Sequence, residues 1–179
     1  MPVRSKKSKA PPRKQASGTR KTPVASQPIL PASYGVKTTS KSLLDWDWAR
    51  ERLTKSENYV VVTVYPDGRP HAMGMHGMWF EDAFYFGTGK KTRKAKNLAQ
   101  NPRCIILTDQ LEELVIVEGT AEIVSLASLP EGLSEKNRKK YGWPLHEGRD
   151  SGIYKVRPTK VFGIPMKQFG TAFTRWKFE

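Results

Sequence analysis

A β-branched run followed by a tight-turn signal constrains the fold of this chain most. The segment Tyr59–Tyr65 consists of Val, Thr and Tyr only, a composition typical of a strand with much of both faces buried. The residues after it, Pro66 to Gly68, predict a tight turn, because proline presets φ and glycine accepts a positive φ. We therefore expect residues 69–80 to return as a second strand, antiparallel to the first.

Short strand patterns dominate the rest of the folded region. Residues 83–88 would complete a three-stranded antiparallel meander, and residues 104–108 and 113–124 would form a second hairpin. A last strand over residues 154–164 is interrupted at Pro158. Short helices are predicted over residues 45–53, 92–100 and 128–139. Many short antiparallel strands with few helices predict a mainly β (α+β) fold, in the form of a small β-barrel.

The charge of the chain divides it into two parts. The 179 residues carry a net charge of +14, and their hydrophobic content of 37% suits one modest domain. Residues 1–41 hold ten Lys or Arg and no Asp or Glu, which leaves 21 basic and 17 acidic residues for the remainder. We expect residues 1–41 to be a disordered basic tail, because they lack the apolar surface that would offset ordering. Residues 42–179 form the folded domain.

The role of the basic tail stays open between three interpretations. It is a solubilising extension, an electrostatic arm that contacts nucleic acid or another polyanion, or a targeting peptide. No apolar run approaches the length of a membrane span, so no membrane partner is expected. The single cysteine, Cys104, lies in an apolar run and is predicted to be a core residue. These features favour a cytoplasmic protein.

Several chemistries have no support in the sequence. There is no Cys-x-x-Cys or His-x-x-x-His pair for a zinc site. His71 and His76 are five apart on a predicted strand and would point to opposite faces, so they make a poor metal pair. No nucleophile elbow, Walker sequence or dinucleotide fingerprint is present, and no acid or base for catalysis is evident.

The turn between the strand 83–88 and the helix 92–100 is a candidate phosphate site. A helix N-terminus already favours an anion through its free N–H groups and its dipole. Here it carries the hydroxyls of Thr88 and Thr92 and two cations, Arg93 and Lys94, which oppose the dipole of an isolated helix. The cations are explained if a dianionic phosphate binds between them. The alternative is a solvated basic helix end.

Two further stretches are candidates for ligand contact. The segment from Arg69 to Trp79 is rich in Met, Gly and Ala, so a flat ligand could lie against its backbone. Alternatively, its methionines fill gaps in a barrel core. Near the chain end, Arg175 beside Trp176 suits the cap of a pocket, or else a plain surface anchor.

Together these stretches resemble the pyridoxamine 5′-phosphate oxidase-like flavin-binding split barrels. The resemblance rests on Gly-Arg-Pro-His at residues 68–71, on the Met-rich strand, and on the run from Thr92 to Arg103. It extends to Val-Ile-Val-Glu-Gly-Thr-Ala-Glu at residues 115–122. It implies a homodimer of six-stranded split barrels that binds FMN, or a deazaflavin relative, at the subunit interface. Short peripheral helices would surround each barrel.

The resemblance also implies roles for individual residues. Arg93 and Lys94 would hold the cofactor phosphate, assisted by the hydroxyls of Thr88 and Thr92. The backbone of residues 73–76 would run along the edge of the isoalloxazine ring, and the C-terminal segment would approach the ring. The implied cofactor-binding residues are Met73, Gly74, Met75, His76, Thr88, Thr92, Arg93, Lys94, Arg175 and Trp176.

Two departures from the vitamin oxidases concern the substrate. A glutamine that contacts the flavin is replaced by Leu114, and the C-terminal element that binds the vitamin phosphate is missing. We therefore expect an FMN-dependent oxidoreductase that acts on another small molecule. The alternatives are a reductase that uses the deazaflavin coenzyme F-420, and a non-catalytic flavin- or haem-binding protein. Lys90, Lys91 and Lys96 would suit the acidic tail of the deazaflavin.

Overall fold

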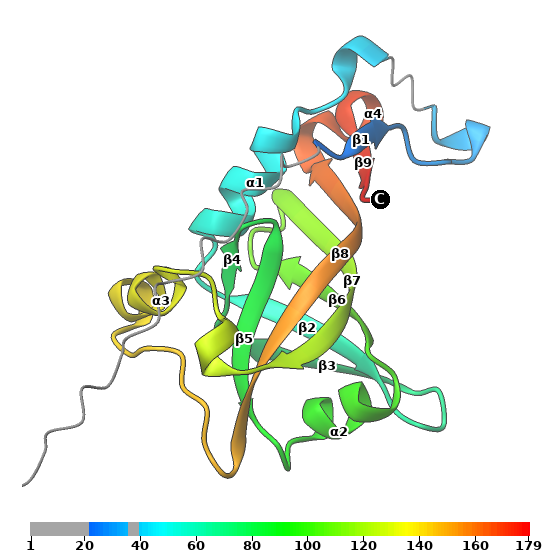
Figure 1. Cartoon of the computed structure of the whole chain (residues 1–179). Helices are drawn as coiled ribbons and strands as arrows, with labels where there is room; N and C mark the ends of the chain where they lie inside the picture. Colours follow the sequence, from blue (N-terminus) through cyan, green and yellow to red (C-terminus); the bar gives the residue numbers. More distant parts are fainter. Residues whose placement is uncertain (1–21, 36–39) are drawn as a thin grey trace, which may run out of the picture.

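A nine-stranded antiparallel sheet organises residues 22–35 and 40–179, which are the residues that the computed structural model describes. Its six longest strands follow the path β3-β2-β6-β7-β8-β5 and curve into the split barrel that the resemblance implied (Figure 1). The strands are β1 (Val24–Ser26), β2 (Tyr59–Val64), β3 (Pro70–Met75), β4 (Met78–Phe80), β5 (Ala83–Gly89), β6 (Arg103–Thr108), β7 (Glu113–Val124), β8 (Ser151–Pro165) and β9 (Thr174–Lys177).

The longest strand, β8, connects the two halves of the sheet. One of its edges pairs with β7, while the other pairs first with β5 and then with β9. The prediction that Pro158 interrupts this strand is wrong, because β8 is continuous through it. A shift of register opposite, between Glu118 and Gly119, accommodates the proline. Gly119 is required there, since a Cβ would lie 2.4 Å from the carbonyl oxygen of Arg157.

The barrel opens at a break in the predicted strand 69–80. The prediction of one strand and a three-stranded meander is wrong, because β3 pairs with β2 whereas β4 pairs with β5. At the break, the Tyr141 hydroxyl lies 2.8 Å from the carbonyl oxygen of Gly77 and 3.3 Å from its N–H. A Cβ on Gly77 would lie 2.2 Å from the ring of Phe84, so only glycine fits. The edge of β3 that faces away from β2 is therefore unpaired among the described residues.

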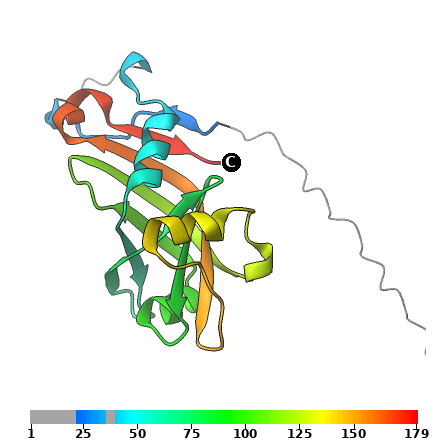
Figure 2. The same cartoon turned by 90° about the vertical axis from the view of Figure 1, so that its left-hand side faces the viewer.

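Two helices lie at opposite ends of the barrel, and a third covers its side (Figures 1 and 2). The predicted helices 45–53 and 92–100 are confirmed as α1 and α2. The prediction for 128–139 is wrong at its start, because Pro130 and a short 3₁₀ turn precede α3. The helices are α1 (Trp46–Lys55), α2 (Arg93–Gln100), α3 (Leu133–Tyr141) and α4 (Phe169–Ala172), with 3₁₀ turns at Ala32–Tyr34, Ser40–Ser42, Leu126–Ser128 and Met166–Gln168.

Alternate residues of β5 serve two hydrophobic clusters. Phe84 and Phe86 point into the barrel, where they join the main core with side chains of α1 and α2. Ala83 and Tyr85 point outward into a smaller cluster beneath α3. Cys104 belongs to the main core as predicted, and burial raises the pKa of its thiol to about 12. The outer side of β5 is thus covered by α3 at Ala83 and Tyr85 and is not exposed to solvent there.

Part of the segment assigned to the tail is ordered. Residues 24–26 form β1, which pairs with β9 from Val24↔Lys177 to Ser26↔Arg175. The expectation of disorder therefore fails for these residues. The predictions for residues 1–21 and 36–39 lie outside the described residues. Within the part of the chain that the structure describes, no helix has the length and apolar character needed to cross a membrane.

Candidate functional site

The predicted phosphate turn is formed by the end of β5 and the start of α2. Thr92 is the N-cap residue of α2, and its hydroxyl accepts a hydrogen bond from the N–H of Ala95 at 3.4 Å. The same hydroxyl donates to the carbonyl oxygen of Gly89 at 2.8 Å and lies 3.3 Å from the hydroxyl of Thr88. The two hydroxyls predicted to assist an anion are thus adjacent, in front of a helix N-terminus.

Arg93 and Lys94 lie in the first turn of this helix, which contains no acidic residue. The guanidinium of Arg93 lies over the ring of Tyr65, 4.9 Å from its centroid, which fixes its direction. Lys94 is partly buried, and this burial lowers the pKa of its ammonium group. Among the described residues, Lys94 has no hydrogen-bond or ion-pair partner. A partly desolvated cation without an anion at a helix N-terminus is the chemistry of a phosphate site.

The Met-rich strand β3 lies at the open edge of the sheet. Met73 and Gly74 are exposed, Met75 is partly buried against the main core, and β3 pairs only with β2. The interpretation that its methionines fill core gaps is therefore wrong for Met73. An edge strand with free N–H and C=O groups and small side chains can bind the edge of a flat ligand through its backbone.

A cavity of about 240 Å³ lies beside the end of β5, next to the break between β3 and β4. Gly87 and Thr88 line it from β5 and His76 lines it from the break, so the structure brings two of the predicted residues, His76 and Thr88, to one place. The opposite wall is the connection from α3 to β8, with Trp143 and His146. This wall was not predicted from the sequence, although a Trp and a His close together after the glycine that ends a helix are a usable signal.

The connection from α3 to β8 is attached to the phosphate turn. The N–H of Lys90 donates to the carbonyl oxygen of Asp150 at 2.8 Å. The ammonium of Lys90 lies 3.2 Å from the carbonyl oxygen of Gly148 and 3.3 Å from that of Arg149. Lys91 lies 3.9 Å from the carboxylate of Asp150. Two of the three lysines suggested for an acidic cofactor tail are therefore engaged within the chain.

Arg175 and Trp176 lie far from the phosphate turn within one chain. Both belong to β9, which pairs with residues 160–163 of β8, whereas β5 pairs with residues 151–156. Trp176 is only 1% exposed and packs edge-on against Trp46 at 5.5 Å, so it is a core residue. Within one chain these two residues therefore lie away from the phosphate turn, and their approach to the cofactor stays a prediction.

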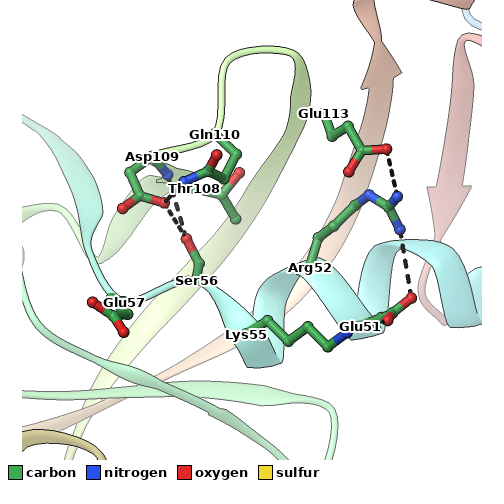
Figure 3. Close-up of a pocket in the computed structure, with 9 residues that line it drawn as sticks. All are labelled: Glu51, Arg52, Lys55, Ser56, Glu57, Thr108, Asp109, Gln110 and Glu113. Carbon is green, nitrogen blue, oxygen red and sulfur yellow. Dashed lines mark hydrogen bonds and ion pairs between the residues drawn. The ribbon is translucent and has the colours of Figure 1, made fainter.

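A cavity of about 430 Å³ at the C-terminal end of α1 is a weaker candidate (Figure 3). Its charged side chains are largely neutralised by one another, since Arg52 lies 2.6 Å from Glu113 and Lys55 lies 2.6 Å from Glu51. The carboxylate of Asp109 accepts a hydrogen bond from the hydroxyl of Ser56 at 2.6 Å. Glu57 and Asp109 have no ion-pair partner among the described residues, so the charge left over in this cavity is negative and does not suit an anionic cofactor.

Residues 22–35 and 40–179 contain few side chains that could bind a metal ion or carry out redox chemistry. These residues contain no group of three His, Cys, Asp or Glu that could hold a metal ion. The hydroxyl of Thr63 lies 3.4 Å from His71, and His76 lies against Tyr141, so the two histidines have different neighbours. What the site offers is a helix N-terminus with two cations and two hydroxyls, together with an unpaired edge of β3 among the described residues.

Comparisons with known proteins agree with this arrangement. The family model described as Pyridoxamine 5′-phosphate oxidase matches residues 46–164, which include α1, α2 and strands β2 to β7. None of the curated proteins matches the sequence. Among solved structures, an F420 reductase is 27% identical, with a TM-score of 0.50 over 63% of this chain and 94% of that protein.

Two other structures share the fold at lower identity. A proposed pyridoxamine 5′-phosphate oxidase from Listeria innocua is 20% identical, with a TM-score of 0.56 over 66% of this chain and 97% of its own. General Stress Protein 26 from Bacillus anthracis is 22% identical, with a TM-score of 0.55 over 66% of this chain and 92% of its own. The family match and the split barrel together show that this chain belongs to the pyridoxamine 5′-phosphate oxidase-like family.

Proposed function

We propose that this protein is an FMN-dependent oxidoreductase that acts on a small molecule. The observation that carries the proposal is the partly buried ammonium of Lys94, which has no acceptor among the described residues, beside Arg93 at the start of α2. A dianionic phosphate would supply the missing charge and accept a hydrogen bond from the hydroxyl of Thr88, whereas the hydroxyl of Thr92 could donate to it only by leaving the carbonyl oxygen of Gly89. Bound FMN would supply hydride or electron transfer, which no side chain here can supply.

The side chains of the chain have binding and orienting roles in this proposal. The ring of Tyr65 orients the guanidinium of Arg93, and the N-cap hydrogen bond of Thr92 stabilises the start of α2. The free edge of β3, from Met73 to His76, would receive the polar edge of the flavin ring through backbone groups. The exposed methionine side chains would exclude water from the ring.

A second copy of the chain would complete the site. The outer faces of β2, β6, β7 and β8 form one apolar surface, in which the register places Val60 beside Leu107 and Leu107 beside Ile116. A continuous apolar surface across four strands favours a protein interface. Its partly buried apolar members are Val60, Val62, Ile105, Leu107, Leu114, Ile116, Phe162 and Ile164.

The homodimer has its own test. Ile116→Glu places a carboxylate in the centre of this surface, and we expect the mass in analytical ultracentrifugation to fall from dimer to monomer. FMN affinity should fall with it, because the cofactor would lie at the interface. Ile123→Glu is the matched control, since Ile123 is exposed on the same strand but outside this surface. A dimer that survives Ile116→Glu, or a wild-type monomer that binds FMN tightly, would exclude the interface.

The cofactor is tested by fluorescence titration of the full chain with FMN. Removing two charge-assisted contacts with Arg93→Ala and Lys94→Ala together should weaken binding by about 100-fold or more. The matched control is Lys91→Ala with Lys96→Ala, which removes the same charge from neighbouring exposed positions and should change the affinity by less than about tenfold. Equal losses in the two double variants would show that only overall charge matters.

The deazaflavin coenzyme F-420 is the second candidate cofactor, because the F420 reductase structure is 27% identical to this chain. Against it, the interactions of Lys90 and Lys91 with the β8 connection occupy cations that an acidic tail would need. Titration with both cofactors separates the candidates. Turnover with a reduced nicotinamide and an artificial acceptor separates an enzyme from a non-catalytic flavin or haem carrier.

A further inference from the structure

The cavity beneath the connection from α3 to β8 lies on the opposite side of β5 from the barrel core. Gly87 follows Ala83 and Tyr85 on the outward face of the strand, so its missing side chain leaves a hollow in the smaller cluster. A Cβ at this position would touch only Leu145, at 4.0 Å. The hollow is therefore a space that this sequence keeps open, and its floor is strand backbone.

Aromatic rings surround the hollow on one side. The ring centroid of His76 lies 4.7 Å from that of Tyr141 and 5.5 Å from that of Trp143. The rings of Tyr141 and Trp143 are stacked, with their centroids 5.9 Å apart. The amide of Asn137 donates a hydrogen bond of 2.8 Å to the carbonyl oxygen of Trp143, which anchors the backbone of the connection. Trp143 nevertheless remains 51% exposed. A large ring held in place yet half open to solvent is suited to stack on a flat ligand.

The polar groups of the cavity favour a ligand that accepts hydrogen bonds. The lining includes two imidazoles, His76 and His146, and the hydroxyl of Ser151, but no Asp or Glu. The volume of about 240 Å³ is below the range of sites for drug-sized ligands, so it suits one or two rings. These features select a small aromatic carboxylate or carbonyl compound.

We propose that this cavity is a separate binding site for a small planar aromatic compound that bears a carboxylate or carbonyl group. The ring would stack on Trp143 over the backbone of Gly87, and the substituent would face the two histidines. The cavity borders the phosphate turn, because Thr88 and Gly89 also line it, but its aromatic wall and the hollow at Gly87 belong to neither Arg93 nor Lys94. Its further role as the substrate site beside the flavin rests on the proposed function, because His76 would border both.

The test is a titration of the full chain with 4-hydroxybenzoate. NMR of the five indole N–H groups locates the binding, and calorimetry measures the affinity. We expect the signal of Trp143 to move, and Trp143→Ala to weaken binding by about tenfold, while Trp143→Phe retains most of it. Gly87→Val fills the hollow from the strand and should abolish binding. Leu126→Ala is the matched control, since Leu126 is an exposed apolar residue outside the cavity.

Three results would overturn the proposal. They are movement of other indole signals without that of Trp143, unchanged affinity in both Trp143→Ala and Gly87→Val, and loss of binding when FMN saturates the protein. The last result would make the cavity part of the cofactor site. The variant with Arg93→Ala and Lys94→Ala should bind 4-hydroxybenzoate normally. Binding of this probe to a protein that binds no FMN would therefore reject the cofactor proposal and retain the cavity.

Discussion

The helices α1 and α2 occupy opposite ends of the same barrel, yet their charges are arranged in opposite ways. α1 has Asp47 in its first turn and Lys55 in its last, which matches the helix dipole. Its charges are also paired, for example Arg50 with Asp47 at 2.6 Å. α2 has Arg93 and Lys94 in its first turn and no acid there. The first arrangement stabilises a helix, whereas the second costs stability unless an anion binds.

The comparison separates residues that serve the fold from those that serve the ligand. Both helices bury apolar side chains in one core, Leu53 from α1 and Leu98 from α2. They differ in what is left at the surface. α1 leaves ion pairs that need nothing further, and α2 leaves cations that need a partner. The start of α2 thus departs from the charge pattern that stabilises helices, which is the kind of departure expected at the proposed ligand site.

The largest effect should come from the two buried leucines. Leu53→Ala and Leu98→Ala should each lower the free energy of unfolding by about 2–5 kcal/mol, because each leaves a cavity in the core. Urea denaturation measures this loss. We expect FMN affinity of the folded protein to fall only in Leu98→Ala, which loosens the start of α2. An equal loss of FMN affinity in both variants would contradict the proposal that α2, and not α1, contributes to FMN binding.

The pH dependence of FMN binding should follow Lys94. Burial lowers the pKa of this ammonium in the free protein, and the phosphate dianion stabilises its protonated form. Below that pKa no proton is taken up on binding. Above it, binding requires a proton, so the affinity should fall by up to about tenfold per pH unit as the pH rises.

Lys94→Arg is the control for this pH dependence, because arginine stays protonated across the accessible range. Its affinity for FMN should remain level at pH values where that of the wild type declines. The same decline in both proteins would assign the titration to the cofactor or to another group.

The two helix starts should respond differently to loss of the N-cap side chain. Thr92→Ala removes a hydrogen bond to Ala95 and should cost about 1 kcal/mol in thermal unfolding, with Thr92→Ser close to the wild type. Asp45 caps α1 without a side-chain hydrogen bond, so Asp45→Ala should lose only the dipole interaction of about 0.3–1 kcal/mol. High salt should remove the cost of Asp45→Ala and leave that of Thr92→Ala. Identical salt dependence would contradict the assignment.

The smallest effect should be a gain in stability. Lys94→Gln removes a cation from the start of α2 and should stabilise the FMN-free protein by about 0.3–1 kcal/mol while it weakens FMN binding. Lys96→Gln, two residues further along the helix and exposed, should leave both quantities within error. A loss of stability in Lys94→Gln would mean that Lys94 has a structural partner and would remove the main support for the phosphate site.

The turn before α2, with its cap and its two cations, was predictable from the sequence because its determinants are local, whereas its binding of a phosphate stays a proposal. Thr92 caps α2, and Arg93 and Lys94 follow it directly, so three successive residues carry the signal. The strand β2 was predictable for the same reason, since its β-branched residues and the turn after it are contiguous. Resemblance to the family then supplied the barrel, which local patterns support only in outline.

What the sequence could not show depends on contacts between distant segments. The break at Gly77 is held by Tyr141, 64 residues further along the chain, and no local pattern announces it. The placement of Trp143 against His76 follows from the same contact. The burial of Trp176 was not predictable, because a Trp beside an Arg at a chain end looks exposed, whereas Gly163 leaves a space for its ring.

The pairing of β1 with β9 has a consequence for the order in which the molecule assembles. It joins residues 24–26 to residues 175–177, so nearly the whole described chain must be closed into a loop before this pair forms. Contacts of such long sequence separation form late in folding. Because β1 is only three residues long and borders no further strand, it should also be the first to detach. A partner that bound the basic segment before residue 24 would therefore act directly on β1, the strand that pairs last and detaches first.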